Sequence, residues 1–365
     1  MKKNRQLFAK IILLCAGILV ALALFEVFLR FVYPQTLNVY AYDGDYLFGF
    51  RPFSQIDYSF TGTSRLVKFN SEGFRDIEHD YFHKPSGTRR IMLLGDSFVA
   101  GIEVDVNETF VHRIRQSFPD VEVISAAVNG WSTEQEFLFL KKRGLKYQPD
   151  VVALVYYVGN DQIDNVGRAL LAYDGKDLVK NKDRPLSQSR LRAVYYSISS
   201  TFHAFNFFQT MYWKIREMFN RPYGQDYDNA FVQYLKKSDE PGIVFAWEKT
   251  FALLDEMHSV LSSEGIDFVL ILVPEQVQSN PVLRKQRSIG ENGLVIDKPQ
   301  ILLKEYAASR DIPVLDLLPA FQASANETLH FDTDFHWNAA GHALAAEEIA
   351  TFLKSRPDLL DNGEQ

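Results

Sequence analysis

The sequence has almost no cysteine, because Cys15 is the only one among 365 residues. A single cysteine excludes an intrachain disulfide and any cysteine-rich metal site. Cys15 lies inside a long apolar run, and Leu14 precedes it where a lipid-attachment site would have a small residue. We therefore expect Cys15 to face lipid rather than to carry chemistry.

The chain also lacks an excess of basic residues, with 39 Lys and Arg against 46 Asp and Glu. The resulting net charge of -7 offers no basic surface to nucleic acid, which excludes that class of partner. An apolar fraction of 47% is ordinary for a globular protein, and the length allows one large domain or two small ones. The 29 Phe and 17 Tyr residues indicate a large core, with a sugar-stacking surface as the alternative.

The amino terminus combines a basic tag over residues 1–10 with an apolar segment over residues 11–32. This segment is close to the roughly 20 residues that span a bilayer. Basic residues ahead of such a segment stay in the cytoplasm, so the rest of the chain is expected on the extracytoplasmic side. Ala21-Leu22-Ala23 resembles a signal-peptidase site, which makes cleavage and release the alternative. Because apolar residues continue beyond this site, we favour an uncleaved single-pass anchor.

Residues 33–88 form a membrane-proximal section that is rich in Tyr, Phe and Gly. Weak alternation of polar and apolar residues predicts a few short strands or an extended wrap. Asn70 to Arg75 has the composition of a turn, and we expect a solvated loop there rather than a fixed arginine.

From Arg89 onward, short apolar runs alternate with helical patterns. This rhythm predicts a parallel sheet with helices on both faces. Residues 162–242 break the rhythm and are interpreted as an inserted helical subdomain, which could pack as structure, close over substrate or contact a membrane surface. The predicted strands are residues 91–94, 121–124, 151–158, 268–273 and 313–317, and the predicted helices include 134–143, 247–263, 301–309 and a final one capped by Asn338.

Ser97 follows the first buried strand of this pattern, in the turn Gly95-Asp96-Ser97. Open α/β sheets keep their ligand crevices at the carboxyl ends of strands, so this hydroxyl is expected to be accessible. A tripeptide of this kind also occurs by chance in chains without chemistry. Its functional interpretation therefore depends on a base, an orienting acid and oxyanion donors elsewhere in the chain.

His336 is the candidate base, since it lies between Asp334 and the helix-capping Asn338 in a predicted loop. An acid near an imidazole fixes its tautomer and stabilises its cation. Residues two apart in an extended chain point the same way and lie about 6.6 Å apart, which favours Asp334 as that acid. Asp332 would compete only if the chain turns there.

Candidate oxyanion donors come from three separate strand ends. They are the backbone N–H groups of Ser97 and Gly130 and the side-chain amide of Asn160. A glycine suits the second position because substrate must approach the backbone closely.

These blocks, in this order, resemble the SGNH or GDSL hydrolase superfamily. Gly95-Asp96-Ser97 is similar to its first block, with Ser97 as nucleophile, while Gly130 and Asn160 match the glycine and asparagine of the second and third blocks. His336 opens a segment similar to the last block, with Trp337 replacing its proline. The family usually has its acid three residues before the histidine, and here that position is Thr333. The Asp334-Phe-His-Trp337 segment resembles a form found among exopolysaccharide-modifying members.

The resemblance implies a three-layer α/β/α sandwich around a central parallel sheet, over residues 89–358 apart from the insertion. It implies ester chemistry without a metal or cofactor, on an acylated carbohydrate or another ester. We expect a serine ester hydrolase, with an O-acyltransferase acting on exopolysaccharide as the alternative. A carbohydrate-binding member without catalysis is a second alternative, disfavoured because Ser97 and His336 are both present.

Overall fold

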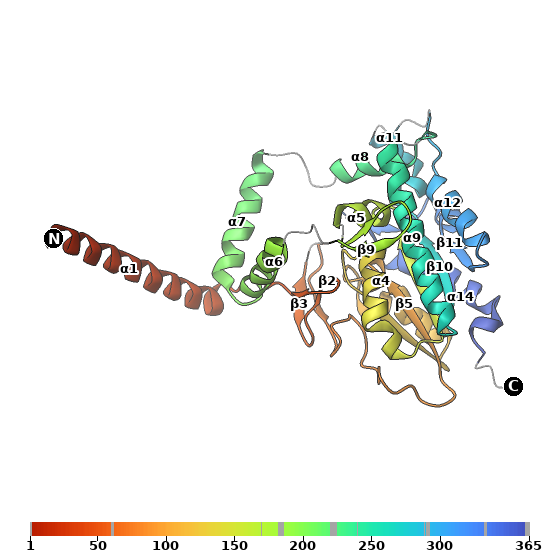
Figure 1. The fold of residues 1–365 in the computed structure, drawn as a ribbon, viewed down its shortest axis with the longest axis horizontal. Coiled ribbons are helices and arrows are strands. Elements are labelled where there is room, and N and C mark those ends of the chain that lie inside the picture. Colours follow the sequence, from red (N-terminus) through yellow and green to blue (C-terminus); the bar gives the residue numbers. More distant parts are fainter. Residues whose placement is uncertain are drawn as a thin grey trace. The chain divides into compact units, whose positions relative to one another are not determined.

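The computed structural model describes residues 2–59, 62–168, 170–181, 186–219, 225–238, 240–287, 289, 293–331 and 334–361 (Figure 1). The chain divides into two compact units. The smaller unit comprises Met1–Tyr42 and Leu186–Tyr223, and the larger comprises Asp43–Pro185 and Gly224–Gln365.

The larger unit is built on a five-stranded sheet in the order β11-β10-β7-β5-β6. All of its strand pairs are parallel, as the sequence predicts. In the register, Gly95 pairs with Ala127 on one side and with Val155 on the other, so the carboxyl ends of the central strands share one edge. The strands are β5 (Arg89–Gly95), β6 (Val121–Ala127), β7 (Val151–Tyr157), β10 (Asp267–Val273) and β11 (Val314–Asp316).

Helices form a layer on each face of this sheet, which confirms the predicted three-layer sandwich (Figure 1). One layer contains α3 (Phe110–Ser117) and α14 (Ala339–Lys354), which pack together. The other contains α4 (Thr133–Lys142), α5 (Asp161–Arg168) and α9 (Pro241–Ser263). The remaining helices of this unit are α2 (Ser97–Ala100), α8 (Gln225–Tyr234), α10 (Gln276–Ser279), α11 (Pro281–Gln286), α12 (Lys298–Ala308) and α13 (Leu318–Ala323), with short 3-10 helices at Val106–Glu108, Gly144–Tyr147 and Pro357–Leu359.

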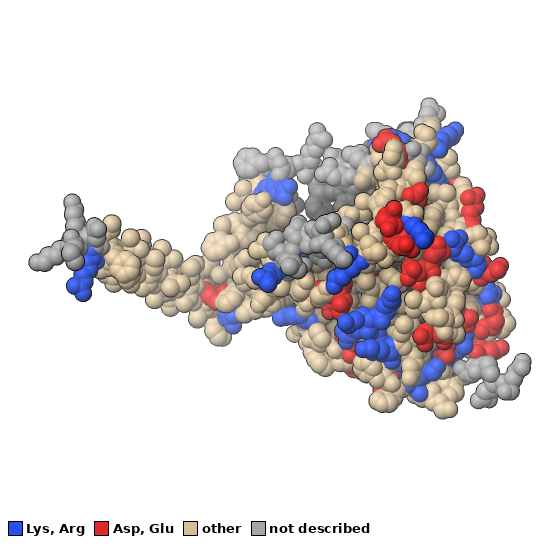
Figure 2. All heavy atoms as spheres, in the orientation of Figure 1, with Lys and Arg blue, Asp and Glu red and all other residues tan. Residues whose placement is uncertain are grey.

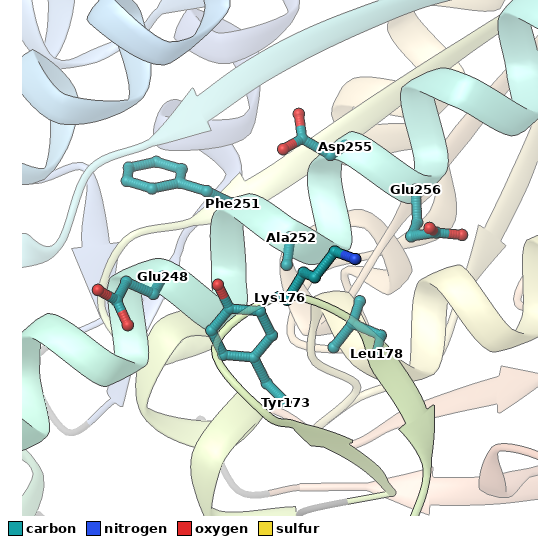
Figure 3. A pocket seen from close by; sticks show the side chains of 8 residues that line it. All are labelled: Tyr173, Lys176, Leu178, Glu248, Phe251, Ala252, Asp255 and Glu256. Atoms are coloured by element: carbon teal, nitrogen blue, oxygen red, sulfur yellow. The ribbon is translucent and has the colours of Figure 1, made fainter.

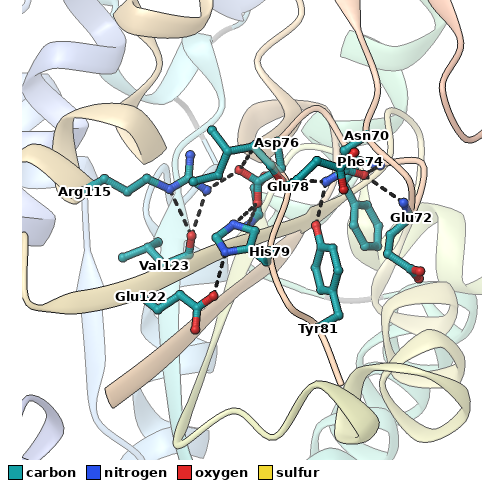
Figure 4. Close-up of polar contacts among 12 residues, drawn as sticks. Asn70, Glu72, Phe74, Asp76, Glu78, His79, Tyr81, Arg115, Glu122 and Val123 are labelled. Atoms are coloured by element: carbon teal, nitrogen blue, oxygen red, sulfur yellow. Dashed lines mark hydrogen bonds and ion pairs between the residues drawn. The ribbon is translucent and has the colours of Figure 1, made fainter. Parts of the chain in front are cut away.

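The predicted membrane-proximal section contains β2 (Leu47–Phe50) and an antiparallel pair, β3 (Gln55–Tyr58) with β4 (Arg65–Lys68). The residues that follow β4 lie against the edge strand β6. The buried carboxylate of Asp76 accepts a hydrogen bond of 2.7 Å from the backbone N–H of Ser125 on β6. It also pairs with Arg115 (Figure 4). His79 links Asp76 to Glu122 (Figure 4). The bond from Ser125 occupies a backbone N–H on an edge strand that would otherwise be open to pairing with another chain.

The expectation of a solvated loop at Asn70 to Arg75 is wrong. Arg75 is buried, and its guanidinium donates to the carbonyls of Gly101 and Val104, the latter at 2.7 Å. The turn itself is held by Asn70, whose side chain accepts from Phe74 N–H at 2.9 Å (Figure 4). Three carbonyl groups of the loop after Ser97 point inward, and Arg75 satisfies them where water cannot reach.

The segment expected as an insertion, residues 162–242, is shared between the units. Helix α5 and the hairpin of β8 (Leu171–Tyr173) and β9 (Leu178–Lys180) belong to the larger unit. Glu134 on α4 accepts from the N–H groups of Leu170 and Leu171 and pairs at 2.8 Å with the buried Lys249 of α9. This charged contact ties α4, the hairpin and α9 together.

The smaller unit contains α1 (Lys2–Val32), β1 (Tyr40–Asp43, which extends to the unit boundary), α6 (Leu186–Ser199) and α7 (His203–Phe219). Among the described residues, Arg5–Val32 is a helix long and apolar enough to cross a membrane. Figure 2 shows an uncharged surface along most of α1, with Lys and Arg at its amino-terminal end. By length and composition it fits either a signal anchor or a cleaved signal peptide.

Candidate active site

Ser97 is the first residue of α2, and only Asp96 separates it from the end of β5. The side chain of Asp96 caps this helix by accepting from Phe98 N–H at 2.9 Å. A Cβ atom on Gly95 would lie 2.5 Å from Val99 and 3.2 Å from the carbonyl oxygen of Val155, so only glycine fits here. The motif therefore makes the sharp bend from strand to helix that leaves the Ser97 hydroxyl at the sheet edge.

His336 reaches Ser97 from the other end of the domain. The expectation of a loop at His336 is wrong, since Asp334–Trp337 forms β13, antiparallel to β12 (His330–Phe331). Strand pairing satisfies backbone groups that a loop would leave to water. Trp337 is buried against Phe98 and Phe321, with ring centroids 4.9 and 5.0 Å apart, and anchors this strand in the core.

The three predicted catalytic side chains form one hydrogen-bonded line. Ser97 Oγ lies 2.7 Å from His336 Nε2, and His336 Nδ1 lies 2.6 Å from Asp334 Oδ1. Since an ionised carboxylate can only accept, Asp334 accepts a hydrogen bond from the proton on Nδ1. In the neutral imidazole this leaves Nε2 to accept from the Ser97 hydroxyl. The competing acid, Asp332, lies outside the described residues, as does Thr333.

A second carboxylate, which the sequence analysis did not single out, faces the same imidazole. Glu103 is buried, with Oε1 3.7 Å from His336 Nδ1, and Asn129 donates to that oxygen at 3.3 Å. No sequence motif around Glu103 indicates a role in the site. Glu103 and His336 are far apart in the sequence, and only the folded loop after α2 brings them together. Arg75, which holds that loop, could not be connected to the site from sequence either.

These charges determine the protonation of His336. Burial by itself lowers the pKa of His336, but the negative charges of Glu103 and Asp334 outweigh it and raise that pKa to about 9. The pKa of Asp334 is lowered, because its hydrogen bond and charge interaction with His336 outweigh the opposing effect of burial. The neighbouring His330 and His342 are buried and remain neutral, since burial lowers the pKa of each to about 3.

Three more carboxyl groups are buried, on Asp96, Glu136 and Asp161. Burial raises the pKa of each, and the mutual repulsion of their charges adds to the effect for Glu136 and Asp161. Both side-chain oxygens of Glu136 lack a hydrogen-bond partner among the described residues. The protonated form of this group is therefore favoured.

The predicted oxyanion donors follow the strands that flank β5. Gly130 comes after β6 with a φ of 82°, a left-handed conformation that favours glycine. Asn160 comes after β7, and its Oδ1 is buried without a hydrogen-bond partner in the described part of the chain. The N–H of Ser97 is at the start of a helix, where no intrahelical acceptor exists. The shared sheet edge brings these three positions to the Ser97 side, and their role as donors remains a prediction.

One ligand atom each from Glu103, Asp334 and His336 lies within 4.8 Å of the others, a spacing that could hold a metal ion. The 2.6 Å contact between Nδ1 and Asp334 is instead a hydrogen bond, whose proton occupies the lone pair that a metal would need. That the site works without a metal remains a prediction.

A surface pocket of about 290 Å³ lies elsewhere, between the β8–β9 hairpin and α9 (Figure 3). Tyr173 and Phe251 line it together with the charged side chains of Lys176, Glu248 and Asp255. None of the predicted catalytic residues lines this pocket, so the site at Ser97 rests on its hydrogen-bond geometry.

One segment of the chain matches a known protein-family model. Residues 235–365 match the model of the SGNH hydrolase-like domain of the acetyltransferase AlgX, a segment that includes Asp334 and His336. Among curated protein sequences, none matches this chain.

Similar solved structures include an acetyl xylan esterase, AlAXEase, at 13% identity and a TM-score of 0.40, covering 72% of this chain and 98% of that one. A lipase/acylhydrolase from Enterococcus faecalis has 18% identity, a TM-score of 0.40 and coverage of 73% and 96%. TesA has 12% identity, a TM-score of 0.39 and coverage of 73% and 99%.

The parallel sheet, the strand-end serine and the match of residues 235–365 are together those of an SGNH hydrolase-like fold. As an enzyme the protein is of the SGNH/GDSL type, an esterase or acetyltransferase.

Proposed function

We propose that this protein is a membrane-anchored O-acyltransferase that modifies an exported polysaccharide. The observation that carries the chemistry is the hydrogen-bonded line from Ser97 through His336 to Asp334. Transfer is preferred over hydrolysis because the matching family model describes an acetyltransferase. The carbohydrate acceptor rests on the resemblance of the last block to exopolysaccharide-modifying members.

The reaction proceeds in two balanced steps. Ser97 Oγ attacks the acyl carbonyl of the donor ester while His336 Nε2 takes the hydroxyl proton, and that proton then leaves with the donor alcohol. A sugar hydroxyl next attacks the acyl group on Ser97, His336 takes its proton, and the same proton returns to Ser97. In both steps the Ser97 and Gly130 N–H groups and the Asn160 amide stabilise the oxyanion.

Hydrolysis would follow the same path with water as the attacking group, so the fate of the acyl group distinguishes the two activities. Phe335 lies beside His336 and stacks on Tyr157 with 40% of its surface exposed. Such an aromatic face can hold a sugar ring at the site. It supports a carbohydrate acceptor over water.

The location of the site follows from the amino terminus. We infer that α1 remains as an uncleaved anchor, and that the basic residues before it keep that end in the cytoplasm. The larger unit then works on the extracytoplasmic side, where exported polysaccharide is present.

The deciding experiment follows an isotope-labelled acetyl group from an activated ester in the presence of a soluble polysaccharide acceptor. The proposal expects label on the polysaccharide, with Phe335→Ala lowering the share transferred relative to free acetate. Label that reaches only water, at a rate the acceptor does not change, would make the protein an esterase. If the label stays on the donor with both the parent protein and Ser97→Ala, the protein has no acyl-transfer or esterase activity and is a binding protein.

A further inference from the structure

Helix α7 begins where the candidate membrane helix α1 ends. The carboxylate of Glu26 accepts hydrogen bonds from the backbone N–H groups of His203, at 3.1 Å, and Ala204, at 2.8 Å. The same carboxylate pairs with Arg30, which in turn donates to the carbonyl oxygen of Thr201. Glu26 therefore satisfies the free N–H groups at the start of α7 and fixes that end to α1.

The described side-chain contacts between the two helices lie near the start of α7. The ring of Phe25 lies 5.5 Å from that of Phe207 and 5.8 Å from that of Phe208, measured between centroids. Figure 1 shows α7 leading away from the end of α1 rather than running along it. A helix that leaves the end of a membrane-spanning helix in this way starts at the membrane surface.

Beyond this contact, α7 carries an exposed apolar stripe on one face. Phe208, Met211, Tyr212 and Ile215 follow the i, i+3, i+4, i+7 spacing of a single helix face, and their exposed fractions range from 43% to 59%. Phe208 belongs both to this stripe and to the contact with Phe25. The stripe therefore continues the side of α7 that faces α1.

Basic residues outnumber acidic ones over the two helices α6 and α7. From residue 186 to residue 219 the sequence has four Lys and Arg and one acidic residue, Glu217. An apolar stripe with Lys and Arg on the remaining surface is typical of helices that lie in a membrane interface. Anionic headgroups attract such basic residues by about 1 kcal/mol each close to the surface. The four basic residues are Arg190, Arg192, Lys214 and Arg216.

We propose that α7 lies flat in the headgroup region of the bilayer that α1 spans, with the stripe from Phe208 to Ile215 turned toward the acyl chains. Tyr212 then sits at the level where aromatic side chains concentrate in membrane proteins. The opposite face of α7, which includes Thr210 and Trp213, points to water. This inference rests on the anchor proposed above and is independent of the acyl-transfer chemistry, so each can fail alone.

Tryptophan fluorescence tests the placement of each face of α7. Trp131, Trp247 and Trp337 are buried, whereas Trp213 is 45% exposed. In the full-length protein, Trp213 reports on the water-facing side. The double substitution Tyr212→Trp with Trp213→Phe moves the exposed reporter onto the stripe, and Trp213→Phe alone gives the buried background for subtraction.

Both reporters are measured in vesicles of phosphatidylcholine and phosphatidylglycerol, with iodide as the aqueous quencher and chain-brominated lipid as the membrane quencher. We expect brominated lipid to quench the reporter at position 212 and iodide to leave it largely unquenched. For Trp213 the expected order is reversed, with iodide quenching it more than brominated lipid does.

Two results would overturn the proposal. Iodide quenching of both reporters, without quenching by lipid, would place α7 in water or on another protein surface. Equal quenching of both reporters by lipid would place the helix inside the bilayer rather than along its surface. Ile215→Glu should raise iodide quenching at position 212, while Thr210→Glu, on the opposite face, serves as the matched control and should not. An unchanged result for Ile215→Glu would also contradict the proposal.

Discussion

The carboxylate of Glu103 lies 3.7 Å from Nδ1 of His336. Asp334 binds the same ring nitrogen, so two acids stabilise one imidazolium. Because a general base must be neutral to accept a proton, kcat/KM should rise with pH toward the His336 pKa of about 9.

Glu103→Gln removes one of the two charges that favour the cation. The apparent pKa on the rising limb of kcat/KM should therefore fall by roughly 1 or more, as expected for the loss of an opposite charge at this range. The measurement is a pH profile with a chromogenic acetyl ester. The control is Asp105→Asn, which removes an exposed carboxylate two residues along the chain. It should leave the apparent pKa on the rising limb of kcat/KM unchanged. If the apparent pKa of Glu103→Gln equals that of the parent, the charge of Glu103 has no effect on His336 and the side chain has a packing role alone.

Asp334→Asn should lower kcat far more than Asp332→Asn does, since Asp334 makes the 2.6 Å contact with His336. A comparable substitution in a serine protease triad lowers kcat by about 10⁴. Both variants are assayed on the same ester, with circular dichroism as the check on folding. A larger loss at Asp332 would make that residue the orienting acid.

Asn160→Ala should lower kcat by roughly 10²–10³ and leave KM nearly unchanged, because an oxyanion donor acts on charge that develops in the transition state. Steady-state kinetics on the chromogenic ester separate the two parameters. If KM rises while kcat holds, Asn160 binds the ground-state substrate instead.

The sequence predicts the architecture well because each sheet strand is a short apolar run bounded by turn residues. It also predicts the meeting of Ser97, Asp334 and His336, since motif order and extended-chain geometry carry that information. It does not predict Glu103 or Arg75, whose roles depend on contacts between segments far apart in the chain. It does not predict the strand Asp334–Trp337 either, because strands this short lack a clear alternating pattern.

Glu136→Gln should stabilise the protein at alkaline pH. Burial, with a further contribution from the charge of Asp96, raises the pKa of Glu136 well above 4.5. Above pH 4.5 the unfolded chain releases this proton while the folded protein keeps it, so stability falls as pH rises. Glutamine is neutral at every pH and avoids this loss. Thermal unfolding in detergent should show a higher Tm for the variant at alkaline pH and a much smaller difference below pH 4.5.

The exposed Glu305 on α12 provides the control for that measurement. Glu305→Gln should leave Tm unchanged at both pH values. A Glu136→Gln variant that is less stable than the parent at alkaline pH would show that the carboxylate is ionised and paired in the folded protein.

The most direct test of the serine mechanism is the mass of the peptide that contains Ser97, taken after rapid mixing with an activated acetyl ester and acid quenching. We expect an acetyl group on Ser97 that is absent in His336→Ala and disappears faster when polysaccharide acceptor is added. Continued turnover of the ester by the parent protein with no acetyl group on Ser97 at any mixing time would contradict it.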